Sequence, residues 1–128
     1  MISEHDAPEL FDSRGGGMSQ VLSASGRLIV VSGQVALNAQ AELIGENDFE
    51  AQAVQVFENV QAALKAAGAS FRDVVRLGSY LTDITNLSIL REVRIRYLVE
   101  PFPAATAIET RLALPGLLVE VDAIAVVD

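Results

Sequence analysis

Two carboxylates near the C-terminus, Glu120 and Asp122, have the residue type and the spacing that acid and base chemistry requires. They fall two positions apart in residues 117–127, which are expected to form a strand, so both project from one face about 7 Å apart. Two nearby carboxyl groups can divide the acid and base roles when their surroundings separate their pKa values. The opposite face of this segment is wholly apolar. We predict a catalytic or ligand-polarising role for Glu120 and a structural or solvent-facing role for Asp122.

Three of the nine basic residues, Arg91, Arg94 and Arg96, lie close together in a segment with helical signals. In one interpretation Arg91 reaches from the helix into a binding cleft, where its forked guanidinium could hold a carboxylate. In the other, the three arginines form a solvated helix face on which Glu92 pairs with Arg96 four residues later. The second interpretation is the default for such a cluster. Arg91 is kept as a candidate substrate-binding residue.

The composition excludes several other kinds of site. The chain has no cysteine, so disulfides, thiolate nucleophiles and zinc–cysteine sites are excluded. Its one histidine, His5, lies in the N-terminal segment, where neither a Ser-His-Asp triad nor a metal site is expected. A net charge of −8 argues against a protein whose main partner is nucleic acid.

The chain is also unusually apolar for its size. Apolar residues make up 51% of it and the mean hydropathy is +0.36, which favours association through an apolar surface. No apolar run approaches the roughly 18 residues that span a bilayer, and the acidic start, MISEHDAPELFD, does not resemble a signal peptide. We expect one cytoplasmic domain over residues 1–128 with no membrane partner.

The first half of the chain predicts strands followed by a helix. Residues 1–17 are expected to form an irregular, flexible arm, followed by a weak strand at 18–23 and a stronger one at 27–32. Gly33 suggests a β-bulge or a bend. Asn47 and Glu50 form a possible capping box for the first helix, and Gly68 is its expected C′ residue.

The second half predicts a central strand at 74–81 and a helix from Thr85 or Asn86 to Leu98. Strands at 104–113 and 117–127 follow, and the Leu-Pro-Gly turn between them predicts an antiparallel hairpin. The predicted fold class is α+β, a mixed β-sheet with two helices packed on one face. Other subunits are the expected cover for the opposite face.

Short motifs from residue 18 to residue 126 resemble the RidA/YjgF family of small trimeric proteins, in their order and their spacing. The matching pieces are Ser19-Gln20, Val31-Ser32-Gly33-Gln34, Glu58-Asn59-Val60, Ala66-Ala67-Gly68-Ala69-Ser70, Asp73-Val74-Val75, Leu81-Thr82-Asp83, Pro103-Ala104 and the strand that contains Glu120. The resemblance implies a chorismate-mutase-like homotrimer with a ligand cleft at each junction of two subunits. It also implies hydrolysis of enamines and imines to a keto acid and ammonia, with no metal or organic cofactor.

The chain departs from this family at several expected cleft positions. The family glutamate is retained as Glu120 and a polar cleft residue as Ser32. Ala105 stands where active members carry the arginine that clamps the substrate carboxylate, and Met18 stands where they carry a tyrosine. Such a clamp contributes about 1.5–3 kcal/mol for each hydrogen bond to the charged group.

Two further positions complete the predicted cleft. Arg91 falls where many members carry asparagine, and we include Ala107 among the substrate-binding residues.

Two functions fit these departures. One is an imine hydrolase that uses Glu120 and a water molecule, with Met18 and Ala105 making the cleft larger and more apolar for an altered substrate. The other is a trimer without catalytic activity that binds a small metabolite or a partner. Ribonuclease activity, also attached to the family, has little support, because the chain is acidic, lacks a core histidine and has only 5% aromatic residues.

Overall fold

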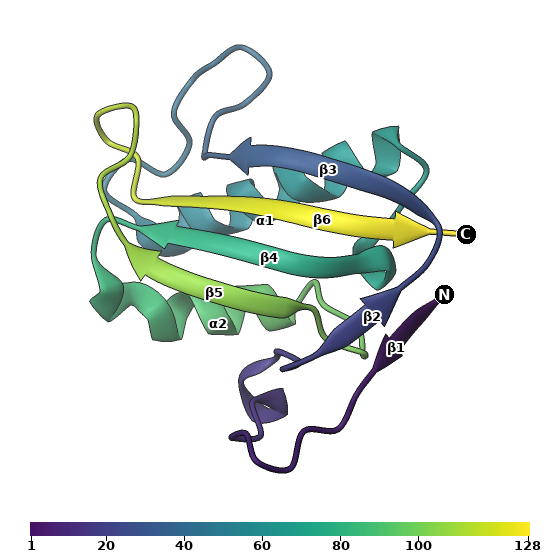
Figure 1. Ribbon diagram of the computed structural model, residues 1–128. Helices are drawn as coiled ribbons and strands as arrows, with labels where there is room; N and C mark the ends of the chain where they lie inside the picture. The colour runs from purple at the N-terminus through teal and green to yellow at the C-terminus, as the bar shows by residue number, and fades with distance from the viewer.

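A computed structural model describes all 128 residues, and its main layers are a four-stranded mixed sheet and two helices on one face of that sheet (Figure 1). The strands lie in the order β3-β6-β4-β5. In chain order the strands of this sheet and its two helices are β3 (Arg27–Gln34), α1 (Phe49–Ala66), β4 (Val74–Leu81), α2 (Leu87–Ile95), β5 (Ala104–Glu109) and β6 (Val119–Val127). The predicted α+β class, with a mixed sheet and both helices on one face, is confirmed.

The position of β6 differs from the prediction. β5 and β6 do not form a hairpin; β6 lies between β3 and β4, antiparallel to both, and β5 pairs parallel with β4 at the sheet edge. Burial explains this order, because alternate residues of β6 from Val119 to Ala125 are at most 1% exposed and a central strand is covered better than an edge strand. Residues 110–118 carry the chain past the end of β4, where Leu118 accepts a hydrogen bond from the Thr82 amide.

Helix α1 begins one residue later than predicted. Its N-cap is Asp48, whose side chain accepts a hydrogen bond from the Ala51 amide. The capping box predicted for Asn47 and Glu50 is therefore wrong: Asn47 has a φ of 56°, outside the extended region that an N-cap residue adopts. The predicted C′ residue is confirmed, since Gly68 follows the helix with a φ of 77°.

Helix α2 ends at Ile95, before the predicted Leu98, and its arginines do not form one solvated face. Arg94 is only 2% exposed and donates a hydrogen bond to the Gly16 carbonyl at 2.8 Å. It lies on the buried side of the helix, one turn from Leu90. Arg96 pairs with Glu50 of α1 at 3.7 Å, so the predicted pair with Glu92 is wrong.

The N-terminal segment is more ordered than predicted. β1 (Ile2–Glu4) pairs antiparallel with β2 (Leu22–Ala24), and residues 14–16 form a 3-10 turn. The irregular arm expected over residues 1–17 is wrong for residues 2–4, which pair with the backbone edge of β2, whereas residues 5–13 contain no strand or helix. The weak strand expected at 18–23 is the shorter β2.

The core fills the space between the sheet and the two helices. Its largest fully buried side chains include Phe57 and Leu64 of α1, Leu77 of β4 and Leu90 of α2. These residues share one face of each element, which is what the apolar periodicity of the sequence predicts. No helix has both the length and the apolar character needed to cross a membrane.

Candidate functional site

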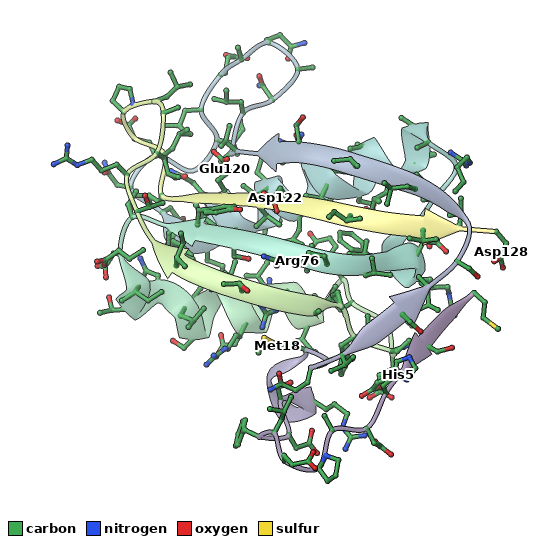
Figure 2. All side chains as sticks on the ribbon, viewed as in Figure 1. His5, Met18, Arg76, Glu120, Asp122 and Asp128 are labelled. Carbon is green, nitrogen blue, oxygen red and sulfur yellow. The ribbon has the colours of Figure 1, made fainter.

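The sheet face opposite the helices, here called the open face, carries the chemically active residues of the central strands. Glu120 and Asp122 point to it because the residues that alternate with them on β6, Val119, Val121 and Ala123, are buried against the helices. The strand register sets Glu120 beside Tyr80 and Asp122 beside Gly78. Figure 2 views this face and labels Glu120, Asp122 and Arg76 along β6 and β4. The open face therefore gathers two carboxylates, a phenol and a guanidinium.

Glu120 is half-buried against the bulge of β3. The β3–β6 register gains one residue between Val31 and Gln34, which confirms the bulge expected at Gly33. A side-chain carbon built at Gly33 would lie 2.2 Å from Glu120 Oε2, so the carboxylate fills the space that a larger residue would need. Ser32, which precedes Gly33 in β3, is exposed. This packing holds the carboxylate in place at the strand edge.

The two carboxylates of β6 have different surroundings. Asp122 accepts hydrogen bonds from the Gly78 amide at 3.1 Å and from the Tyr80 hydroxyl at 2.9 Å. Glu120 accepts none from its own chain, so its oxygens are free for water or a ligand. The structural role predicted for Asp122 is confirmed, because its bonds tie β6 to β4.

The two tyrosines of the chain are expected to ionise above the usual tyrosine pKa of about 10. The hydrogen bond to Asp122, followed by burial, raises the pKa of Tyr80. Burial, followed by the nearby Glu58 carboxylate, raises the pKa of Tyr97. The folded protein thus retains protons that the unfolded chain releases. The free energy of unfolding should be at its full value below pH 10 and should fall as the pH rises through the folded-state values.

Phenolate absorbance measured against pH tests this expectation, since the chain has no tryptophan or cysteine to interfere. A Tyr80→Phe variant leaves Tyr97 as the only signal, and a Tyr97→Phe variant does the reverse. A Tyr80 pKa at or below the usual tyrosine pKa would contradict the hydrogen bond to Asp122.

The other predicted site residues lie elsewhere. Ala105 pairs in register with Leu77, which is fully buried, so Ala105 faces the helices, and Ala107 shares that side two residues later. Met18 is half-buried close to the start of β5 (Figure 2), and Arg91 is exposed on α2.

The predicted cleft is consequently divided within one chain. Glu120 and Ser32 belong to the open face, whereas Ala105, Ala107 and Arg91 belong to the helix side. A single chain does not bring the two groups together.

Arg76 is the open-face residue that the sequence analysis did not select. It is half-buried on β4, next in register to Ile124. The signal in the sequence was one charge in the apolar strand VVRLGSYL, two residues before Gly78. That signal could not identify a site, because only the sheet order reveals that Arg76 and Glu120 share a face.

A cavity of about 420 Å³ lies in the N-terminal segment and is lined by residues that include His5, Phe11 and Arg14. The guanidinium of Arg14 already has a partner, because it donates two hydrogen bonds to the Asp12 carboxylate at 2.9 Å each. No group of three or more histidine, cysteine, aspartate or glutamate side chains is arranged to hold a metal ion. The open face therefore remains the better candidate site.

Comparison with known proteins gives one consistent family. A family model described as Endoribonuclease L-PSP matches residues 14–127. A RutC family protein of Pyrococcus horikoshii is 34% identical over 110 residues, which are 86% of each chain. The 2-iminobutanoate/2-iminopropanoate deaminase of Bos taurus is 33% identical over 100 residues, 78% of this chain and 73% of that one. The crystal structure of YyfB, a Rid family protein of unknown function from Yersinia pestis, matches with a TM-score of 0.88 and 33% identity over 98% of both chains.

Proposed function

Because the chain belongs to the Endoribonuclease L-PSP family, which includes the RutC and RidA/YjgF proteins, we propose that it is a homotrimeric imine or enamine hydrolase with an altered substrate preference. In the proposed reaction water adds to the carbon of the C=N bond and ammonia leaves, which gives a carbonyl compound. No metal or organic cofactor takes part. We place the protein in the cytoplasm, as expected from its sequence.

The observation that carries this proposal is the Glu120 carboxylate. It is half-buried, is held against Gly33, and accepts no hydrogen bond from its own chain. A carboxylate in this state can accept a proton from an attacking water and return it to the departing nitrogen. Ser32, the residue before Gly33 in β3, offers an exposed hydroxyl group.

Two features support the homotrimer and its clefts between subunits. The open face exposes large apolar side chains, among them Leu28 at 64% and Val30 at 70% exposure, and burying such residues favours association. The division of the predicted cleft across the sheet also favours assembly. Glu120 of one copy could then face Ala105, Ala107 and Met18 of a neighbour.

The altered preference is proposed from Ala105. A methyl group cannot donate hydrogen bonds to a carboxylate, so this position lacks the charged contact expected of the family. With Met18 also in place of a tyrosine, that side of the cleft would be wider and more apolar. Imines of compounds without an adjacent carboxylate would suit it better.

The alternative is a trimer without catalytic activity that binds a small metabolite or a partner. The same two residues, Ala105 and Met18, favour it, because both of the side chains expected to orient a substrate are missing. Nucleic acid is not proposed as a partner, since the net charge is −8.

An imine-loss assay separates these two functions. 2-Iminobutanoate and an imine without a carboxylate would be generated by amine-oxidising enzymes and trapped with semicarbazide, with and without the protein. We expect the wild type to speed the loss of the second imine and Ala105→Arg to shift the preference toward the first. If Ala105→Arg is active and the wild type hydrolyses neither imine, the scaffold is intact but the natural protein has left this chemistry, which favours the binding function or a different substrate. Light scattering should give three times the chain mass of 13.6 kDa, and a monomer would contradict the shared cleft.

A further inference from the structure

A second cavity, of about 220 Å³, lies on the open face between β4 and β5. Its lining includes Arg76, Gly78, Tyr80, Thr106 and Ile108. The register places Thr106 beside Gly78 and Ile108 beside Tyr80, so the lining is one patch across two paired strands. A cavity of about 150 Å³ is enough to hold a benzene molecule. This cavity therefore has room for a single aromatic ring with a short carbon chain.

The side chain of Tyr80 extends along β4 and does not stand up from the sheet. Its hydroxyl donates a hydrogen bond to Asp122, which is in register with Gly78, two residues before Tyr80. A side-chain carbon built at Gly78 would lie only 2.8 Å from the tyrosine hydroxyl oxygen. The ring therefore reaches back over Gly78, and the lack of a side chain at that position makes this possible. The half-buried ring gives the cavity an aromatic wall.

Tyr80 lies between a cation and an anion. Glu120 is its neighbour in register on β6, whereas Arg76 is two residues before Gly78, in the direction that the ring points. Arg76 takes part in none of the four ion pairs, and its side-chain hydrogen bond goes to the Leu77 carbonyl. A guanidinium that no acid holds can stack on an aromatic face. The aromatic wall thus has a guanidinium at one end and a carboxylate at the other.

We propose that this cavity is an aromatic slot, which takes the ring of an arylalkyl imine and directs its C=N group toward Glu120. The inference rests on the proposed function for the reaction only. The ligand ring would stack on Tyr80 and the Arg76 guanidinium, and Ile108, which is 45% exposed, would cover its edge. Gly78 and Glu120 are diagonal neighbours on paired strands, about 7–8 Å apart, a distance that a ring with a short chain spans.

The two charges set the orientation of the ligand. A protonated imine carries its positive charge at the nitrogen end, which Glu120 attracts and Arg76 repels. The nitrogen therefore faces Glu120 and the neutral ring faces Arg76. Water then adds to the imine carbon, Glu120 passes its proton to the nitrogen, and the C–N bond breaks to give an arylalkyl aldehyde and ammonia. This orientation needs no carboxylate on the substrate, which agrees with the alanine at position 105.

Binding of 2-phenylethylamine, a stable cation that has a ring and a short chain, tests the slot. Calorimetry would compare it with propylamine, which has no ring, and with 3-phenylpropanoate, which carries the opposite charge. We expect the wild type to bind 2-phenylethylamine about 10-fold more tightly than either compound, because burial of the ring and attraction to Glu120 both favour it.

Variants of the lining test whether the ring occupies this cavity. Thr106→Phe would fill the cavity from an exposed position, so we expect it to weaken 2-phenylethylamine binding by about 10-fold. Thr110→Phe, at an exposed position outside the lining, is the matched control and should bind as the wild type does. Tyr80→Leu should weaken binding by about 2- to 10-fold, the range of an aromatic contact, and Tyr80→Phe should weaken it less. In turnover, Thr106→Phe should lower kcat/KM more for the imine of phenylacetaldehyde than for that of propanal.

Several outcomes overturn the slot. It fails if propylamine binds as tightly as 2-phenylethylamine, or if Thr106→Phe and Thr110→Phe bind 2-phenylethylamine equally. It also fails if 3-phenylpropanoate binds most tightly, because its carboxylate would then lie at Arg76. The comparison of the three ligands needs no variant, so it decides if Thr106→Phe does not assemble by light scattering.

Turnover separates this result from the proposed function. Hydrolysis that needs Glu120 but proceeds equally for the aryl and the alkyl imine supports the function and rejects the slot. Binding that needs the ring and is lost in Thr106→Phe, without hydrolysis of either imine, supports the slot and rejects the function.

Discussion

Replacing Gln52 by alanine is expected to lower the free energy of unfolding by about 3–5 kcal/mol. The side chain is fully buried on α1 and makes three hydrogen bonds to backbone groups. It donates to the Gly45 carbonyl at 3.1 Å and the Gly116 carbonyl at 2.9 Å, and it accepts from the Leu118 amide at 2.8 Å. Alanine would leave these groups without their partner, and each buried unsatisfied group costs about 1–3 kcal/mol.

The loss should be large because Gln52 joins two loops that are far apart in the sequence. Its hydrogen bonds connect the turn before α1 to the segment that leads into β6. One of these bonds is to Leu118, two residues before Glu120. Gln55→Ala is the matched control on the same helix. Gln55 is half-buried and donates to the Asn59 side chain, so its loss should cost less than about 1 kcal/mol.

Urea unfolding followed by circular dichroism would measure both variants. A Gln52→Glu variant adds a further test, because it keeps an acceptor for Leu118 but loses both donated hydrogen bonds and buries a charge. We expect it to be at least as unstable as Gln52→Ala. Equal stabilities of Gln52→Ala and Gln55→Ala would show that the loop contacts contribute little.

Local patterns in the sequence were sufficient to predict most elements of the fold. Helical spacing of apolar residues and the glycine at position 68 marked α1, and the alternation around Glu120 and Asp122 marked which face of β6 is buried. The strand order could not be read in the same way. The Pro115-Gly116 turn reports a change of direction but not the partner of the strand that follows, and burial in the assembled sheet decided that β6 pairs with β3 and β4.

The candidate site shows the same limit. A bulge at Gly33 was predictable from the glycine, but its contact with Glu120 depends on the β3–β6 register, which links residues 87 positions apart. Arg94 lies in a run of charged residues and is nevertheless buried, because its guanidinium donates a hydrogen bond to the Gly16 carbonyl in the N-terminal segment. Arg76 was overlooked because a single charge in a strand has no local signature. Each of these features needs contacts between distant parts of the chain.

Replacing Glu120 by glutamine is expected to reduce imine turnover by about 100- to 10,000-fold, the range that proton transfer by one side chain contributes. Glutamine keeps the size of the side chain and its fit against Gly33, but it cannot accept a proton from water. The fall should therefore appear in kcat, with little change in the free energy of unfolding. Glu92→Gln, an exposed carboxylate on α2, is the matched control and should keep full activity. Unchanged turnover in Glu120→Gln would exclude Glu120 as the catalytic base.

Gly33→Ala tests the position of the same carboxylate without removing it. The added carbon would lie 2.2 Å from Glu120 Oε2 and 2.8 Å from its carboxyl carbon, so the side chain must move. The atoms in the way are at the far end of the flexible Glu120 side chain, which can rotate aside. We therefore expect the free energy of unfolding to change by less than about 1 kcal/mol. Turnover should nevertheless fall by about 100-fold, since a small displacement of a reacting group is that costly. A Gly33→Ala enzyme with normal turnover and normal stability would mean that the bulge does not position Glu120 for catalysis.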